Sequence, residues 1–362
     1  GNAPSNPETP FKASGGVVVG CNYIQRSASA VSTVTLVSSR CLESFNATSG
    51  TRRSREYFET DRRAVASACS VLGNTVIVGF KNGVIVCFED STPVRTLRTE
   101  VGELDDLDDD EEEAGGLAYP VITSLIAFRA GAPRVAGGCH DGTVRLWSLE
   151  SCRQLRVFGT PHRSRTAGLS QGEDRPDLPV AAVTAVTYDP SRAWLLAGHA
   201  TGAIQAYDID SGDCVRTFST GAHAGAVVAI SVVLPRVSGT LTTAPDVAHA
   251  GAALPAALTA GALLYVSAGA EGTVCGWDLS LPHASPPCFR HSLQAACLAY
   301  DPLRGVLFAG GSDGSVGLWA VARGGLRLLR RTPALGRAVC CLQYCSEADA
   351  LLAADADGRG ML

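Results

Sequence analysis

Two serines in this chain match the G-x-S-x-G pattern that positions a hydrolase nucleophile. They are Ser170 in GLSQG and Ser312 in GGSDG. The pattern supports nucleophilic attack only where a strand precedes the serine and a helix follows it, because that sharp turn exposes the hydroxyl. Ser170 lies in a Pro- and Arg-rich stretch, and Ser312 lies at a turn between two strand-like runs. We therefore expect both serines to be structural.

The residue types that bind metals do not form a ligand set. Cys341 and Cys345, in CLQYC, would need two further ligands at matching spacing to hold zinc. The seven histidines are scattered, and no HExxH, Walker or paired CxxC motif is present. The thirteen cysteines, an odd number, are expected to be reduced and packed as small apolar residues. The sequence thus predicts no catalytic residues, no metal and no cofactor.

Composition narrows the class of protein. The chain has 362 residues, of which 46% are hydrophobic, with a formal net charge of −5 and a pI of about 5.8. A globular fold fits these values, whereas direct nucleic-acid binding does not, because no basic field attracts phosphates. No apolar run reaches the roughly 18 residues of a membrane helix, and the N-terminus lacks signal-peptide features. We expect a cytoplasmic protein, with the nucleus left open.

One short motif recurs along the whole chain. Its copies are FKNGVIVCFED, GGCHDGTVRLW, HATGAIQAYDI, GAEGTVCGWDL and GSDGSVGLWAV. The turn glycines, with a sixth in DADGRGML, are at positions 83, 142, 202, 272, 314 and 358, so the spacings are 59, 60, 70, 42 and 44. The two shortest spacings match the period of about 40–45 residues of four-stranded propeller blades. A second pair, YDPSRAWLLAGHATG and YDPLRGVLFAGGSDG, repeats in the same order.

Each copy has the composition of a tight β-hairpin. Asp-Gly, Asn-Gly or Thr-Gly separates two runs of period two, and glycine adopts the positive φ that such a turn requires. Apolar runs such as VITSLIAF and AACLAYD precede the hairpins and need cover on both faces. Small sheets obtain that cover by packing around a common axis. The sequence therefore predicts an all-β fold, a seven-bladed β-propeller of four-stranded antiparallel blades, with six blades and a stray hairpin as the alternative.

The propeller is expected to occupy residues 13–362, with irregular first and last blades. The blades are expected over 13–46, 64–98, 119–159, 180–220, 225–290, 292–332 and 336–362. An apolar pair trails each hairpin, and in the first unit we assign this pair to Leu42 and Phe45. The last unit ends after its third strand, so the N-terminal tail, residues 1–12, is expected to supply a fourth strand near Pro10 to Ala13 and to close the ring.

Three insertions interrupt the period. They are the acidic segment 99–118, the polar segment 160–179 and the Ala-, Pro- and Thr-rich segment 235–262. Loops of this length are either functional or disordered. The acidic segment is expected to be a solvated loop, with docking of a basic partner as the alternative.

The hairpins DGTVRLWSL, EGTVCGWDL and DGSVGLWAV resemble the signature of WD-repeat β-propellers, and the resemblance spans roughly residues 15–362. In that family a His, a Ser or Thr, the turn Asp and the Trp form a hydrogen-bonded tetrad. The resemblance implies incomplete tetrads in three units, from these residues: Asp141 and Trp147; His223, Glu271 and Trp277; His291, Asp313 and Trp319. Two other units have Phe88 and Tyr207 in the Trp place.

The resemblance also implies that partners dock on the face that carries the hairpin turns. The candidate contact residues there are Lys81, Asn82, His140, His199, Glu271 and Ser312. Turn carboxylates such as Asp141 and Asp313 can instead bind their own backbone. The leading hypothesis is a non-catalytic scaffold that holds protein or peptide partners in an intracellular multiprotein complex.

Two alternatives are kept. A membrane-surface or phosphoinositide-binding propeller would use the basic segment 324–332 or an N-myristoylated Gly1, since GNAPS matches the acylation pattern. Gly1 also fits a trimmed terminus or a fragment boundary. A ubiquitin-ligase substrate receptor would have Arg or Lys shortly after its Trp-Asp pair, where this sequence has GWDLSLPH.

Overall fold

Strands joined by turns and short irregular segments make up the part of the chain that the structure describes. A computed structural model describes residues 11–13, 16–24, 32–58, 65–99, 120–159, 182–218, 223–233, 263–278, 287, 289–322, 325–332, 335–345 and 348–361. Within these ranges there is no helix, and so none that could span a membrane. The predicted all-β class is confirmed.

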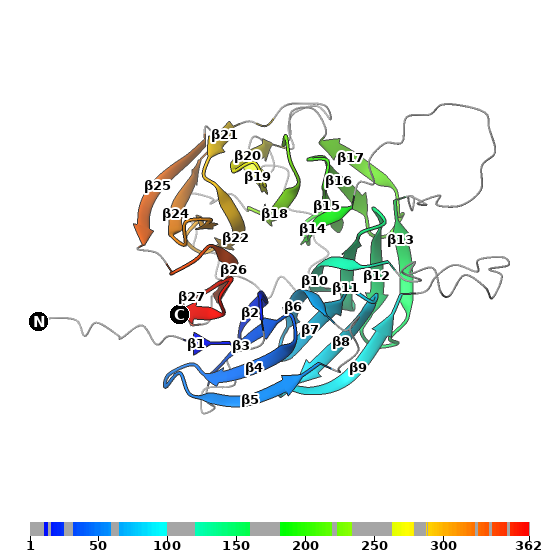
Figure 1. Ribbon diagram of the computed structural model, residues 1–362. Helices are drawn as coiled ribbons and strands as arrows, with labels where there is room; N and C mark the ends of the chain where they lie inside the picture. The colour runs from blue at the N-terminus through cyan, green and yellow to red at the C-terminus, as the bar shows by residue number, and fades with distance from the viewer. Residues whose placement is uncertain are drawn as a thin grey trace, which may run out of the picture.

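The strands form seven four-stranded antiparallel sheets around one axis (Figure 1). Blade 1 is β2 Val18–Ile24, β3 Thr33–Ser38, β4 Cys41–Asn46 and β5 Arg52–Tyr57; blade 2 is β6 Ala66–Leu72, β7 Thr75–Phe80, β8 Val84–Glu89 and β9 Thr92–Arg98. Blade 3 is β10 Ile122–Ala130, β11 Ala132–Cys139, β12 Val144–Ser148 and β13 Gln154–Phe158; blade 4 is β14 Val183–Asp189, β15 Trp194–His199, β16 Ile204–Asp208 and β17 Cys214–Phe218.

The remaining three blades complete the ring. Blade 5 is β18 Val227–Val232, β19 Leu263–Gly269, β20 Thr273–Asp278 and β21 Phe289–Ser292; blade 6 is β22 Ala295–Asp301, β23 Val306–Gly311, β24 Val316–Ala322 and β25 Gly325–Thr332. Blade 7 is β26 Val339–Cys345, β27 Ala350–Asp355, β28 Arg359–Met361 and β1 Phe11–Lys12. We call the strands of a blade inner, second, third and outer, counted from the axis. Seven blades are therefore present, and the six-bladed alternative is wrong.

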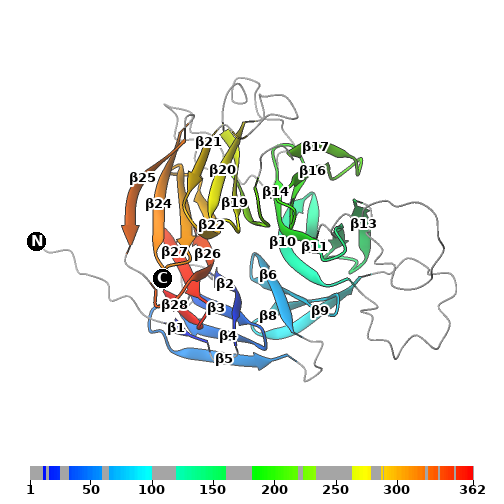
Figure 2. The ribbon, with the colours of Figure 1, turned by 45° about the horizontal axis from the view of Figure 1, so that its top comes forward.

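The two ends of the described chain meet in blade 7. Phe11 and Lys12 pair with Gly360 and Arg359, so β1 is the outer strand of a sheet whose other strands come from the C-terminal end (Figure 2). Phe11 is 0% exposed, and its ring lies 5.7 Å from that of Phe45 in blade 1. This pairing joins the first residues to the last sheet and closes the ring.

The expected first unit, 13–46, is one strand short. Leu42 and Phe45 belong to β4, the third strand, and the outer strand is β5. The sequence of β5, RRSREY, has no apolar period because its side chains are exposed or half-buried. An outer strand needs no buried face, and hydrophobic periodicity therefore did not reveal this one.

Neighbouring blades approach closely at glycines in their second strands. An added Cβ at Gly138 would lie 2.5 Å from Val183 in the next inner strand, and one at Gly198 would lie 2.5 Å from Val227. An added Cβ at Gly79 would likewise lie 2.8 Å from Ile122. The repeated Ala-Gly runs thus let each blade pack its face against the next, which forms hydrophobic clusters that span two blades.

Candidate partner-binding face

Six blades have the same glycine turn between their second and third strands. The φ angles of the turn glycines are between 77° and 86°, at Gly83, Gly142, Gly202, Gly272, Gly314 and Gly358. The turns are closed by backbone hydrogen bonds such as that from Gly142 N to Cys139 O, at 3.2 Å. Alternate connections of an antiparallel sheet lie at opposite ends. All six turns therefore lie on one face of the ring, which we call the upper face.

Lys81 and His140 are the exposed first residues of this turn in blades 2 and 3. Neither side chain has a hydrogen bond or an ion pair with a residue that the structure describes. Blades 2 and 3 are neighbours, so a lysine and a histidine are exposed at equivalent turn positions of adjacent blades on the upper face.

The second turn residue bonds its own backbone in three blades. Asn82 Oδ1 accepts from Val84 N at 3.2 Å, Asp141 Oδ1 from Thr143 N at 3.0 Å and Asp313 Oδ1 from Ser315 N at 3.0 Å. Asp141 also pairs with Arg145 at 3.0 Å. The hydrogen bonds from Ser315 lower the pKa of Asp313. These side chains stabilise the turn, which limits what they can offer to a partner.

Blade 5 contains a buried chain of hydrogen bonds that starts at Trp277 in β20. Its Nε1 donates to Ser267 Oγ at 2.8 Å, and Ser267 Oγ lies 2.8 Å from His223 Nε2. His223 Nδ1 lies 2.6 Å from Glu271 Oε1. Each of these atoms has a hydrogen-bond partner when the indole donates to the serine, the serine hydroxyl donates to Nε2 of the histidine, and Nδ1 of the histidine donates to the glutamate. The imidazole is therefore neutral, with its proton on Nδ1.

The pKa shifts agree with a neutral histidine beside an ionised glutamate. Burial lowers the pKa of His223, and the hydrogen bond to Glu271 opposes this only in part. Burial raises the pKa of Glu271, but hydrogen bonds from Thr273 and His223 outweigh it, and the net pKa is lowered. His223 and Glu271 thus fix the connection before β18 to the hairpin turn, and Glu271 has a structural role here.

Ser267 was not predicted from the sequence, although a Ser or Thr is part of the family's tetrad. It lies in β19 two residues after Tyr265, which pairs with Trp277. The equivalent positions are Gly137 in blade 3 and Ala309 in blade 6, neither of which has a hydroxyl. A comparison of the second strands at this single position would have singled out blade 5.

The other two expected tetrads do not form. Trp147 Nε1 donates to Arg98 O in blade 2 at 3.1 Å, since no hydroxyl is available in its own second strand. His291 is in the outer strand β21, where its Nε2 accepts from Leu326 N at 3.2 Å. Asp313 binds Ser315 and Arg331 instead of a histidine. Trp319 is only half-buried.

His199 is not available to a partner on the upper face. It is 5% exposed and is the last residue of β15, whereas the turn residue after it, Ala200, is exposed. The expectation that His199 is an exposed contact residue is therefore wrong by one position. Gly1 and the three insertions lie outside the described residues, except for Thr99, which is buried at the end of β9.

The serine and cysteine motifs of the sequence have no catalytic or metal-binding partners among the described residues. Ser312 is exposed, and its hydroxyl donates to Gln294 Oε1 at 3.3 Å; no histidine or carboxylate in the described part of the chain is hydrogen-bonded to it. Cys341 and Cys345 are half-buried in β26. In the described ranges the cysteines are free thiols, and no three His, Cys, Asp or Glu residues are grouped to hold a metal ion. Ser170 lies outside those ranges.

Comparison with known proteins supports the architecture. No protein-family model matches the chain, and no curated protein matches it in sequence. Among the solved structures, a chain of the "Crystal Structure of Mitotic Checkpoint Complex" is similar with a TM-score of 0.67, over 99% of this chain and 95% of that chain. The identity is 14%. At that level the likeness shows the fold, a seven-bladed β-propeller, and leaves the function open.

Proposed function

We propose that this chain is a WD-repeat scaffold without catalytic activity, which docks protein or peptide partners on its upper face within an intracellular multiprotein complex. The observation that carries the proposal is the set of six glycine turns with the same backbone conformation on a closed ring. Such a ring holds the turn residues rigidly in place, and a preorganised surface loses little entropy when a partner binds. A chain of similar fold comes from a multiprotein complex, which is consistent with this role.

Lys81 and His140 are the proposed contact residues. Both are exposed on adjacent blades and neither is used by the fold. The positive charge of Lys81 favours a partner with acidic groups, through charge complementarity. Glu271 and Asn82 are weaker candidates because each already bonds within its own blade.

The test is affinity purification of the tagged chain followed by cross-linking mass spectrometry. A double variant, Lys81→Glu with His140→Glu, should lose partners that the unmodified chain retains. Arg153→Glu is the matched control, because Arg153 is an exposed basic residue at the opposite ends of the blade 3 strands. Retention of all partners by the double variant, or their loss in the control, would contradict docking on the upper face.

One observation favours a second function, membrane-surface binding. The outer strand β25 exposes Arg327 and Arg330 together with Leu328 and Leu329, each of the leucines 47% exposed. Arg331 is not available, because it pairs with Asp313. Flotation with anionic liposomes tests this function: Arg327→Glu with Arg330→Glu should abolish binding, while Arg153→Glu should leave it unchanged.

A further inference from the structure

Two cysteines face each other where the first and the last blade of the ring meet. This boundary lies between the inner strands β2 of blade 1 and β26 of blade 7, which are neighbours in Figures 1 and 2, and we call it the seam. Cys21 in β2 is 5% exposed, and Cys341 in β26 is half-buried. Cys21 belongs to a hydrophobic cluster that spans the seam, and Cys341 packs against that cluster.

The strand register explains why these two residues face each other. Cys341 corresponds to Gly20 in blade 1, because each follows the bulge at the start of its inner strand, and Cys21 corresponds to Cys69 in blade 2. An added Cβ at Gly20 would lie 2.4 Å from Cys69 Cβ and 2.8 Å from its Sγ. These two positions therefore come at least as close as the roughly 3.5–4.5 Å between Cβ atoms that a disulfide spans. At the seam both positions are cysteine.

The two thiols are close enough to influence each other. Cys21 Sγ reaches across the seam and donates to Leu352 O in blade 7 at 3.9 Å. Cys341 lowers the pKa of Cys21, but burial outweighs this and leaves that pKa raised. Cys21 in turn raises the pKa of Cys341. Both groups are therefore protonated thiols in the reduced protein, which react slowly and resist brief exposure to an oxidant.

The ring is closed at this end of the chain by a short strand. β1 consists of Phe11 and Lys12, and it pairs with β28, which has three residues. Between blades 2 and 3 a hydroxyl adds a further link, because Ser67 Oγ donates to Ile122 O at 2.5 Å. The equivalent residue of blade 7 is Cys340, whose thiol donates to a carbonyl of its own blade at 3.3 Å. The seam has no hydroxyl bridge at this position.

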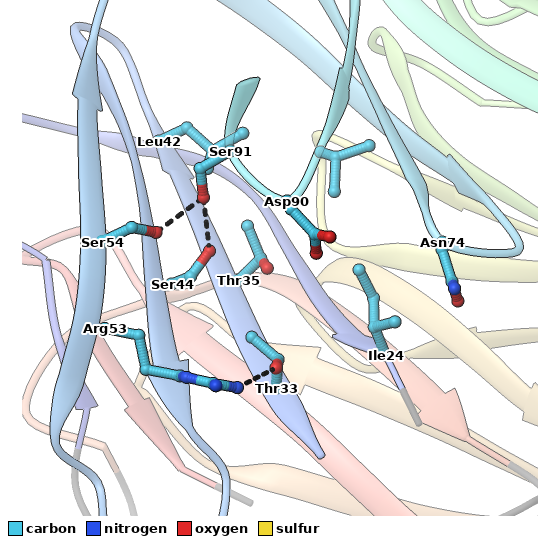
Figure 3. A pocket seen from close by; sticks show the side chains of 11 residues that line it. Ile24, Thr33, Thr35, Leu42, Ser44, Arg53, Ser54, Asn74, Asp90 and Ser91 are labelled. Atoms are coloured by element: carbon cyan, nitrogen blue, oxygen red, sulfur yellow. Dashed lines mark hydrogen bonds between the residues drawn. The ribbon is translucent and has the colours of Figure 1, made fainter. Parts of the chain in front are cut away.

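Blades 1 and 2 show how neighbouring blades are linked by hydroxyls (Figure 3). Beside a polar cavity, Ser91 Oγ of blade 2 lies 3.0 Å from Ser44 Oγ and 2.6 Å from Ser54 Oγ of blade 1. Hydroxyl hydrogen bonds do not respond to oxidants, whereas two facing thiols can exchange their protons for an S–S bond. The seam thus combines a short closing strand with a chemistry that can strengthen the closure.

We propose that Cys21 and Cys341 are a redox-active pair, which a peroxide converts into a disulfide that fastens blade 7 to blade 1. Cys341, the more exposed thiol, attacks the peroxide; the O–O bond breaks, a sulfenic acid forms and one water leaves. Cys21 then attacks that sulfur, the S–S bond forms and a second water leaves. Two electrons pass from the two sulfurs to the peroxide. The pair is independent of the upper face, so this proposal and the docking proposal can fail separately.

The test compares the full chain after prolonged treatment with excess hydrogen peroxide and after treatment with dithiothreitol. Peptide mass spectrometry without reduction should find Cys21 linked to Cys341 in the oxidised sample. The thermal unfolding midpoint should rise by about 5 °C, because a bond that closes a loop of nearly the whole chain restricts the unfolded state. Dithiothreitol should reverse both changes. Absence of this link, its replacement by a link to another cysteine, or an unchanged midpoint would overturn the proposal.

Variants separate this bond from other effects of the peroxide. Cys21→Ser and Cys341→Ser should each abolish the link and the rise in the midpoint. Cys341→Ser is the safer variant for the fold, because Cys341 is half-buried. Cys69→Ser is the matched control, since Cys69 holds the position of Cys21 in the next blade but faces Gly20, and it should retain both changes. A full rise in the midpoint of oxidised Cys341→Ser would show that another modification causes it.

Discussion

Blades 3 and 5 have the same hairpin sequence pattern and different hydrogen-bonding partners for their tryptophans. Trp277 bonds Ser267 in its own blade and, through it, His223 and Glu271. Trp147 bonds the backbone of Arg98 in the preceding blade. The difference comes from one position in the second strand, which is Ser267 in one blade and Gly137 in the other.

This comparison separates two ways to hold a blade in place. In blade 5 the connection before β18 is fixed to the hairpin turn between β19 and β20 by polar groups that depend on one another. In blade 3 the indole fills the boundary with blade 2, and an added Cβ at Gly137 would come within 3.0 Å of its ring. A chain of buried hydrogen bonds fails as a unit when one member is lost, whereas packing fails locally.

Truncation of the two tryptophans should have the largest effect. We expect Trp147→Ala and Trp277→Ala each to lower the free energy of unfolding by about 3–5 kcal/mol, because the side chains are 0% and 3% exposed. The Trp→Phe variants sharpen the comparison. Trp277→Phe should cost more, since Ser267 is 0% exposed, whereas the hydrogen bond from Trp147 to the Arg98 carbonyl is only partly buried. Urea unfolding measures both; equal costs would break the distinction.

Removal of the central histidine should come next. His223→Ala is expected to lower the free energy of unfolding by about 2–3 kcal/mol, because the hydroxyl of Ser267 and the carboxylate of Glu271 each lose one hydrogen-bond partner. His140→Ala, at an exposed turn position in blade 3, is the control and should change stability by less than about 0.5 kcal/mol. A small effect at both positions would mean that the hydrogen-bond chain does not stabilise blade 5.

Acid should destabilise blade 5 in a defined window. The pKa of His223 is below the usual 6.5, so the unfolded chain takes up this proton first. The stability due to neutral His223 is complete above about pH 6.5 and is lost as the pH falls through the folded pKa. Urea unfolding between pH 8 and pH 5, in wild type and His223→Gln, measures this contribution. The variant should show a smaller loss, and an identical pH dependence would contradict a neutral histidine.

The two turn carboxylates should show the smallest difference. Glu271→Gln is expected to cost about 1 kcal/mol, because it weakens the bonds to His223 and Thr273. Asp313→Asn in blade 6 should cost less than about 0.5 kcal/mol, since Asp313 and its partner Arg331 are 53% and 60% exposed and solvent screens the pair. Thermal unfolding of the two variants in parallel tests the order; a larger cost at Asp313 would reverse it.

The fold was largely predictable because its signals are local. A glycine with positive φ marks the hairpin in six of the seven blades, and the period-two runs beside it mark the second and third strands. The outer strand β5 was missed because its sequence has no such local signal. Its exposed sequence, RRSREY, carries no periodic signal, and pairing with β4 alone makes it a strand.

The site residues were less predictable because their partners are far apart in the chain. His223 and Ser267 are separated by 44 positions and Ser44 and Ser91 by 47. His291 precedes its inner strand by the same four residues as His223 does, yet it remains in an outer strand and bonds Leu326. Spacing along the sequence could not distinguish these two histidines.

Sequence alone determined the repeated unit, its turns and the need for each small sheet to be covered on both faces. The tertiary structure decided which side chains meet across those faces: the closure by Phe11, the hydrogen-bond chain of blade 5 and the polar cavity between blades 1 and 2. The reason is that a turn or a strand depends on neighbours a few residues away. A buried contact between blades depends on the rotation of one whole sheet against the next, which is fixed by packing that no single segment encodes.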